Sequence, residues 1–232
     1  EQPGVYTSFK QLVTAIQSNL AGVYKLAADM TADEVGLPEN QTSYIKGEFT
    51  GTLVGTEGSK AYAIYDLKKP LFDILKNATV KDLDLKNTQV DSIENAAAVA
   101  KTADNATISN VAVEGKVSGR KSVAGLVVDA TNTRIENSSF SGKLIANHAD
   151  NNANYAGGIV GKLTGGNAKV DKSKVDVVIS TAARNNNQTA GGIVGKLENS
   201  ALVTRSVTTG KILNGQGYPR VGGIVGSTYP RG

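Results

Sequence analysis

Cysteine and tryptophan are absent from this chain of 232 residues, and histidine occurs once. Without cysteine the chain can form no disulfide bond and can carry out no thiol chemistry. No apolar run approaches the roughly 18 residues that a membrane-spanning helix needs. We therefore expect a protein that inserts no segment directly into a membrane.

Charge is also low and evenly spread. The 25 basic and 21 acidic residues leave a net charge of +4, and no run of five like charges occurs. A nucleic-acid partner is therefore not expected. What the chain does contain is 26 glycines together with many Val, Ile, Ala, Thr and Asn residues. This composition favours short strands joined by many turns, and so an all-β protein.

One hexapeptide recurs along the second half of the chain. It reads AGGIVG at 156–161 and at 190–195, and VGGIVG at 221–226. The related VAGLVV lies one period earlier, at 123–128. A regular spacing of this kind is the sequence signature of a stacked repeat architecture.

A second set of repeats lies between the hexapeptides. Five segments begin at Val80, Ile108, Ile135, Val170 and Val203, and apolar or small residues recur at positions +3, +5 and +9 from each start. The +5 column contains Leu85, Val113, Phe140, Val175 and Thr208, and the +9 column contains Val117, Leu144, Ile179 and Ile212. Even spacings put side chains on one face of a strand, so the odd step from 0 to +3 predicts a bend or bulge.

These columns predict a right-handed parallel β-helix. One repeat cannot bury its own apolar side, but stacked repeats bury a continuous column. We assign residues 23–232 to the β-helix, with repeats of about 27–35 residues and a truncated last repeat. Within the hexapeptide units, alternation predicts that Lys162, Asp129 and Lys196 are exposed and that Ile159, Gly161 and Leu163 point inward. A propeller is the structural competitor, but its repeats are longer and need four strands.

The N-terminal segment has a different pattern. Apolar residues recur at helical spacing in residues 8–22, namely Phe9, Leu12, Val13, Ile16 and Leu20. Ser8 and Gln11 form a capping-box pattern, and Gly22 stands where the helix is expected to end. We expect residues 1–22 to form an α-helical cap over the open end of the β-helix. Residues 23–31, 44–55 and 61–72 read as strands.

Three polar loops are predicted on one side of the β-helix, at 146–155, 181–189 and 213–220. Each leaves the +9 strand and returns before a Gly-Gly unit, so the loops share one phase of the repeat. Insertions on one face of a repeat protein often form its binding surface. The candidate binding residues are Asn151, Asn152, Asn154, Tyr155, Arg184, Asn186, Tyr218 and Arg220. Amides, Tyr and Arg suit a polar polypeptide or a glycan, whereas the alternative is that Asn simply favours turns.

Catalytic patterns are weak. His148 lies in an Asn-rich loop, where a solvated residue is expected. Acidic residues such as Glu114, Asp129, Glu136 and Asp171 fall at outward phases, which favours a solvated face over the paired carboxylates of a glycosidase. We therefore expect no catalytic site in this chain.

Several segments resemble a known family. The series GVYKLAADMTADEV, YIKGEFTGTLVG and YAIYDLKKPLFDILKNATVKDLDL, followed by the AGGIVG units, resembles the N-terminal region of streptococcal zinc metalloproteases of the immunoglobulin A protease family. The Gly-Gly-Ile-Val-Gly unit is also similar to the GLUG repeat of surface proteins. The resemblance covers about residues 20–230.

The resemblance implies a cell-wall-associated endopeptidase whose zinc is held by an H-E-x-x-H helix and a distant Glu in the C-terminal part. This sequence has no such motif, and its single histidine cannot supply two helix-borne ligands. We therefore expect this chain to be inactive and to hold no cofactor, with zinc confined to the absent catalytic domain.

The resulting prediction is a non-catalytic β-helix domain that helps to recognise or position the protein substrate of a zinc endopeptidase. By resemblance that substrate is immunoglobulin A, and the location is extracellular, at the bacterial cell surface. The chain is expected to be a monomer. An alternative is an adhesive or spacer domain that binds host glycan or protein, and a third reading is a polysaccharide-cleaving β-helix enzyme.

Overall fold

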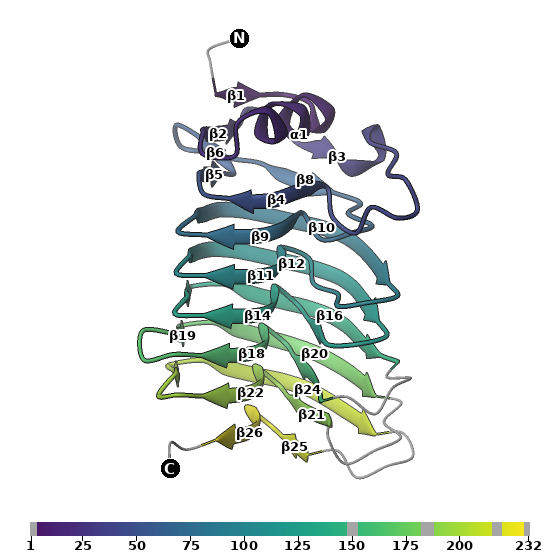
Figure 1. Cartoon of the computed structure of the whole chain (residues 1–232), viewed down its shortest axis with the longest axis vertical. Coiled ribbons are helices and arrows are strands. Elements are labelled where there is room, and N and C mark those ends of the chain that lie inside the picture. The colour runs from purple at the N-terminus through teal and green to yellow at the C-terminus, as the bar shows by residue number, and fades with distance from the viewer. Residues whose placement is uncertain (1–3, 148–152, 182–187, 215–219, 230–232) are drawn as a thin grey trace.

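The computed structural model describes residues 4–147, 153–181, 188–214 and 220–229. Figure 1 shows a stack of β-rungs with one short helix, α1, at its N-terminal end and the C-terminus at the other. Strands of successive repeats pair in parallel. The prediction of a parallel β-helix is therefore confirmed, and a propeller, whose blades are separate sheets, is excluded.

A seven-stranded parallel sheet forms one side of the stack, and four of its strands follow the glycines of the repeated hexapeptide units. Its order is β26-β22-β18-β14-β11-β9-β4. The strands are β4 (Ile45–Phe49), β9 (Phe72–Lys76), β11 (Ala100–Asp104), β14 (Val127–Thr131), β18 (Val160–Thr164), β22 (Val194–Glu198) and β26 (Val225–Tyr229).

A larger sheet of 13 strands runs along another side of the stack. Its main path is β1 (Val5–Tyr6), β2 (Val23–Leu26), β5 (Thr52–Val54), β10 (Thr79–Ser92), β12 (Thr107–Gly119), β15 (Arg134–Glu136), β19 (Lys169–Asp171) and β23 (Leu202–Thr204). Its other members are β3 (Met30–Thr31), β8 (Ala63–Tyr65), β16 (Ser139–Ala146), β20 (Lys174–Thr181) and β24 (Val207–Asn214).

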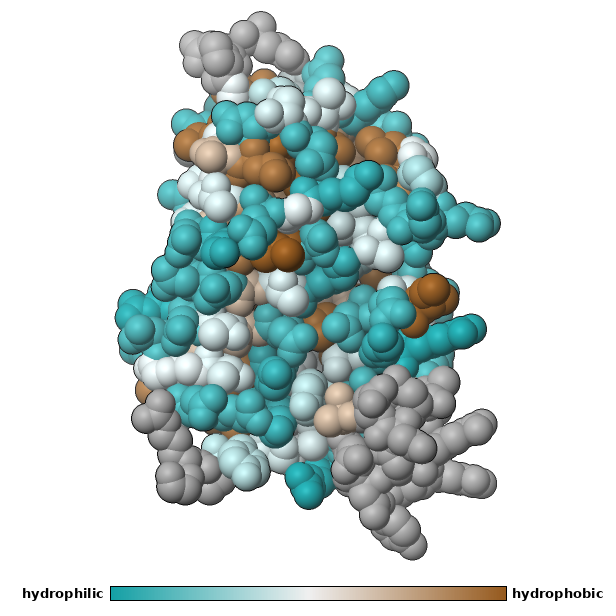
Figure 2. Space-filling model, in the orientation of Figure 1, coloured by the Kyte–Doolittle hydropathy of each residue, from teal (hydrophilic) through white to brown (hydrophobic). Residues whose placement is uncertain are grey.

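A four-stranded sheet precedes the glycine corners. It consists of β13 (Val123–Ala124), β17 (Asn154–Gly157), β21 (Gln188–Gly191) and β25 (Arg220–Gly222). The strands β6 (Thr56–Glu57) and β7 (Lys60–Ala61) form a small antiparallel hairpin. Figure 2 shows mainly hydrophilic residues over the rungs on the face turned to the viewer.

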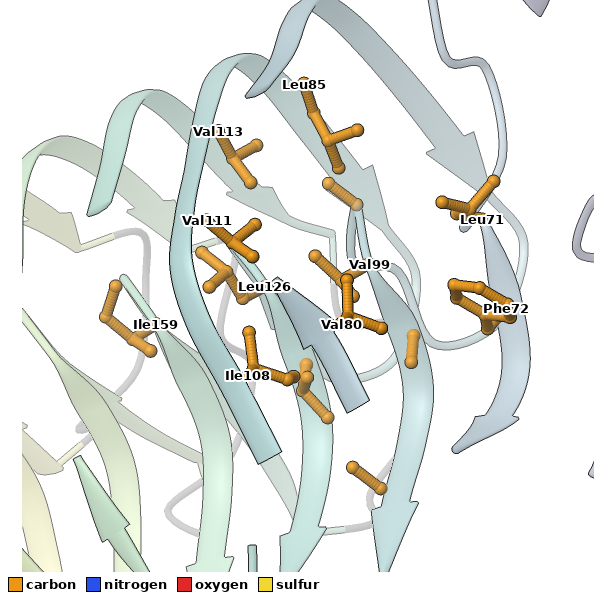
Figure 3. Packing of buried hydrophobic residues seen from close by; sticks show 14 of the residues in the cluster. Leu71, Phe72, Val80, Leu85, Val99, Ile108, Val111, Val113, Leu126 and Ile159 are labelled. Carbon is orange, nitrogen blue, oxygen red and sulfur yellow. The ribbon is translucent and has the colours of Figure 1, made fainter. Parts of the chain in front are cut away.

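The register confirms the predicted columns. Ile135 pairs with Ile108 on one side and with Val170 on the other, and Ile135 is fully buried. The +5 and +9 columns are in register in the same way, from Val113 to Thr208 and from Val117 to Ile212. Figure 3 shows members of this core from neighbouring strands, with the column pair Val80 and Ile108 among them.

A bend accounts for the odd step between the first two columns. The residue at position +2 has a left-handed backbone in every segment, with φ values of 53° for Asp82, 53° for Asn110, 48° for Asn137, 48° for Lys172 and 47° for Arg205. Asn and Asp tolerate this conformation better than most residues. The bend predicted from the sequence is therefore confirmed.

The second glycine of each hexapeptide lies at a corner where successive rungs nearly touch. A Cβ atom on Gly158 would lie 2.1 Å from the carbonyl oxygen of Gly192 and 2.5 Å from Cγ1 of Val175. Side chains cannot occupy such a space, because real Cβ contacts are about 1 Å longer. The repeated glycine therefore reflects close stacking of rungs.

The strand that follows this corner differs in part from the prediction. Ile159 and Leu163 are fully buried in the core, as expected. Gly161 does not join them, because a Cβ there would lie 2.7 Å from the carbonyl oxygen of Val128 and 3.6 Å from that of Tyr155 on β17. Lys162 and Lys196 are only partly exposed, with 33% and 21% of their side chains accessible.

Asp129 is likewise only 34% exposed. Strict alternation fails here because both Ile159 and Val160 donate to the carbonyl of Ile193, which is the hydrogen-bond pattern of a bulge.

Helix α1 (Phe9–Ser18) packs Phe9, Leu12 and Ile16 into the core, where all three are fully buried. The Oγ of Ser8 accepts from the backbone of Gln11, as the capping pattern predicts. The helix ends at Ser18 and not near Gly22, because the backbone of Asn19 is extended, with φ −148° and ψ 93°.

Strand β1 lies inside the segment predicted as the cap and pairs with β2, so residues 1–22 contain a strand as well as a helix. The division of the chain at residue 22 stays a prediction. Among the described residues no helix is long and apolar enough to cross a membrane.

Candidate functional site

The predicted binding residues divide into two groups. Five of them, Asn151, Asn152, Arg184, Asn186 and Tyr218, lie outside the described residues, as does His148. The other three, Asn154, Tyr155 and Arg220, lie on β17 and β25 of the four-stranded sheet. The candidate site can therefore be built only from the strands that border the loops.

The sheet places Tyr155 and Arg220 in one column. Tyr155 pairs with Thr189, and Thr189 pairs with Arg220 on the next strand. At about 4.8 Å per rung, the two side chains start about 10 Å apart along the stack. Tyr155 is partly buried and Arg220 is exposed. This common phase is what the repeat spacing predicted.

Asn154 occupies a different environment. Asn154 is only 3% exposed. It pairs in register with Gln188, which is 1% exposed. A side chain buried to this degree has little area to offer a partner protein. Asn154 therefore belongs to the interior of the described structure. Its low exposure does not support the prediction that it binds a partner.

Two lysines of the hexapeptide strands lie against Tyr155. The Nζ of Lys162 is 5.8 Å from the centroid of the Tyr155 ring, and the Nζ of Lys196 is 5.6 Å from it. Lys196 also lies 5.7 Å from the ring of Tyr229, which is 67% exposed. These distances are within the range of cation–π contacts. We call Tyr155, Lys162, Lys196, Arg220 and Tyr229 the cation–aromatic surface.

Sequence reasoning found Tyr155 and Arg220 but missed the other three members. Lys162 and Lys196 occupy the same position of the hexapeptide unit, and that position was predicted to be solvated. A signal was present, since a lysine repeated in register on one sheet must stack. Their contact with Tyr155 follows from the corner that turns β17 onto β18, which no spacing in the sequence reveals.

The charges of this surface are positive on balance. A hydrogen bond from Lys196 to Glu198, at 2.5 Å, raises the pKa of Lys196, and the nearby Arg220 opposes that effect. Burial raises the pKa of Asp129, while Lys162, 3.9 Å away, opposes this shift. Three cationic side chains therefore stand beside two aromatic rings and two carboxylates.

The acidic residues predicted to be solvated do not all behave alike. Glu114 is exposed, but Asp171 is only 4% exposed and accepts hydrogen bonds from Arg205 and Thr204. The expectation of a solvated Asp171 is therefore wrong, because the next rung covers its carboxylate with an arginine. In the described part of the chain, no group of three His, Cys, Asp or Glu side chains could hold a metal ion.

The described residues thus form a parallel β-helix that carries a cation–aromatic surface, and among them no group of three possible metal ligands occurs. The model of the family described as the M26 IgA1-specific metallo-endopeptidase N-terminal region matches residues 1–115. The resemblance noted in the sequence is therefore confirmed, and the chain belongs to this family of N-terminal regions.

Relatives match over nearly the whole chain. Zinc metalloprotease ZmpC of Streptococcus pneumoniae is 70% identical over all 232 residues, and an immunoglobulin A1 protease of Streptococcus sanguinis is 46% identical over 97% of the chain. A solved structure of an IgA1 protease is 40% identical over 95% of the chain, with a TM-score of 0.89. The chain spans only 12% of the length of the two relatives and 17% of the solved chain.

Proposed function

We propose that this chain is a substrate-positioning domain of an extracellular zinc endopeptidase. The family membership makes it a region of a protease, and the positioning role is inferred from the cation–aromatic surface. Arginine and tyrosine are enriched among the residues that dominate protein–protein binding energies. The single observation that carries the proposal is that Tyr155 and Arg220 share a column beside Lys196, which lies between two tyrosine rings.

The rest of the proposal concerns the full-length protein. The relatives include proteases named for immunoglobulin A1, so we propose immunoglobulin A as the substrate. We place the zinc in a separate catalytic domain, the protein at the bacterial cell surface, and this chain in a monomer. The β-helix would hold the cation–aromatic surface in a fixed orientation, because each rung is buried against its neighbours.

The test is a double variant, Tyr155→Ala with Arg220→Ala, in the full-length protease. If the two side chains contact the whole substrate equally in the ground state and the transition state, their loss raises KM and leaves kcat nearly unchanged. Two contacts of about 1 kcal/mol each would raise KM by roughly 10- to 30-fold. A short peptide that spans the cleavage site should be cut as before, because it would not reach this domain.

A matched control is available elsewhere on the stack, away from the four-stranded sheet. Tyr62 has Lys60 5.1 Å from its ring, and Arg134 is an exposed arginine on β15. The double variant Tyr62→Ala with Arg134→Ala removes the same side-chain types and should leave KM for whole substrate unchanged. If both double variants behave alike, or if whole substrate and peptide respond alike, the positioning proposal fails and the spacer alternative is favoured.

A further inference from the structure

The last rung exposes apolar residues that every earlier rung buries. Ile224 is 47% exposed, whereas its register equivalents Ile159 and Ile193 are fully buried. Val221 is 42% exposed, whereas its equivalent Ala190 is fully buried. Both residues belong to the rung of β25 and β26, which lies at the C-terminal end of the stack in Figure 1. Val221 and Ile224 therefore occupy core positions of the repeat, and no further rung of described residues covers them.

A hollow of about 260 Å³ lies at this end. Its lining includes Gly192, Thr208, Ile212, Val221 and Gly223, which belong to the last two rungs. Among the described residues, β23, β24, β25 and β26 each pair on one side only. Unpaired edges of this kind are usually covered in native proteins.

The glycine column gives a more specific indication. A Cβ on Gly125, Gly158 or Gly192 would lie 2.1, 2.1 or 2.0 Å from the carbonyl oxygen of the equivalent glycine in the next rung. Gly223 has the same place in the last rung, but a Cβ there would meet no atom within 4 Å. Its backbone also lies outside the left-handed region that favours glycine. Nothing in the described structure requires a glycine at position 223.

We propose that the last rung is the docking surface for a further rung of parallel β-helix, which presents a backbone carbonyl to Gly223. The absence of a side chain at position 223 then has the same cause as at Gly125, Gly158 and Gly192. The new rung pairs with β23 to β26 and buries Val221 and Ile224.

The occupant is the polypeptide that follows residue 232 in the full-length protein. From Val80 onward, each rung is covered by residues 27–35 positions later in the chain, as Val80 is covered by Ile108 and Ile135 by Val170. The C-terminal side of the last rung is thus the side that later residues reach. A second copy of the same end would bring its strands antiparallel, which would not reproduce the carbonyl at Gly223.

Hydrogen exchange on the full-length protein tests the proposal. Backbone amides in Val225–Tyr229 should be protected to about the same degree as those in Val194–Glu198, because both strands would be paired on two sides. Gly223→Ala should lower the protection of Val225–Tyr229 at least tenfold, since its methyl group would meet the carbonyl of the next rung. Gly166→Ala is the matched control, because a Cβ at Gly166 also meets no atom within 4 Å.

The substitution Gly223→Ala also distinguishes the two possible occupants of this surface, which are the polypeptide after residue 232 and a second copy of the chain. In the 232-residue chain alone, Gly223→Ala should leave exchange and melting temperature unchanged, whereas Gly192→Ala should lower both protection and melting temperature. The proposal is overturned if Gly223→Ala has no effect in the full-length protein, or if Val225–Tyr229 exchanges equally fast in both chain lengths. It is also overturned if the 232-residue chain dimerises in sedimentation analysis and shows full protection of that strand.

Discussion

Arg205 lies one rung beyond Asp171 and binds its carboxylate with two nitrogens. The Nε of Arg205 donates to Oδ1 of Asp171 at 2.8 Å, and Nη2 donates to Oδ2. The Oγ1 of Thr204 donates to Oδ1 as well, also at 2.8 Å. These hydrogen bonds, those from Arg205 foremost, hold the pKa of Asp171 well below its usual range, although burial of the carboxylate acts in the opposite direction.

The lowered pKa predicts how the stability of the chain depends on pH. An aspartate in the unfolded chain takes up a proton near pH 4, whereas folded Asp171 does so only at lower pH. The stabilisation from this pair is therefore complete above about pH 5 and is lost as the pH falls below about 4 toward the folded pKa. Asp171→Asn should reduce the urea midpoint clearly at pH 7, somewhat less at pH 3 and much less at pH 2. Asp104→Asn, at an exposed residue, should change all three midpoints little; a pH-independent loss in Asp171→Asn would contradict the assignment.

The core column predicts a large difference between two neighbouring positions. Ile135 is fully buried between Ile108 and Val170, so Ile135→Asp would place a carboxylate in an apolar stack. We expect a loss of at least about 3 kcal/mol in the free energy of unfolding. Glu136→Ala, at a partly exposed residue, should cost less than about 0.5 kcal/mol. Equal melting temperatures for the two variants would show that the column is assigned to the wrong phase.

Much of this fold was predictable from the sequence, because the core residues of a stacked repeat recur in the sequence at the period of the repeat. Val80, Ile108 and Ile135 recur at one phase, and the register places them in contact. The odd step of three residues predicted the bend that left-handed residues such as Asn110 make. Both features depend only on the chain's own period, so a single sequence contains them.

The site depended on contacts that no period encodes. Tyr155, Lys196 and Tyr229 come from three different rungs, and only the corner between β17 and β18 brings their side chains together. The pairing of Asp171 with Arg205 could not be predicted either, because it needs the exact register of β19 and β23. Alternation also misplaced Gly161, since the bulge beside Ile193 shifts the phase of that strand.

Asn110 tests how the bend is stabilised. Its backbone has a φ of 53°, and its Nδ2 donates to Oδ1 of Asp82 at 2.9 Å. Asn110→Ala loses that hydrogen bond. Alanine also tolerates the left-handed backbone less well than asparagine, because it has a Cβ but no side-chain amide to stabilise the bend. The total cost should be about 2 kcal/mol. Asn110→Gly loses the hydrogen bond but avoids the steric cost, so it should be less destabilising by roughly 1 kcal/mol. Urea unfolding of both variants would check the order, with Glu114→Ala as the exposed control; the reverse order would refute the argument.

The last prediction concerns zinc. The sequence contains one histidine and no H-E-x-x-H motif, and the described residues contain no group of three possible ligands. Because a catalytic zinc ion needs three protein ligands in a fixed arrangement, the 232-residue chain should keep no stoichiometric zinc after dialysis and should leave immunoglobulin A uncut.

The full-length protease, dialysed in parallel, should retain about one zinc per chain, with three ligands from another domain. Elemental analysis measures both. One zinc held tightly by the short chain would contradict the prediction, and His148→Ala would then show whether the single histidine contributes to the site.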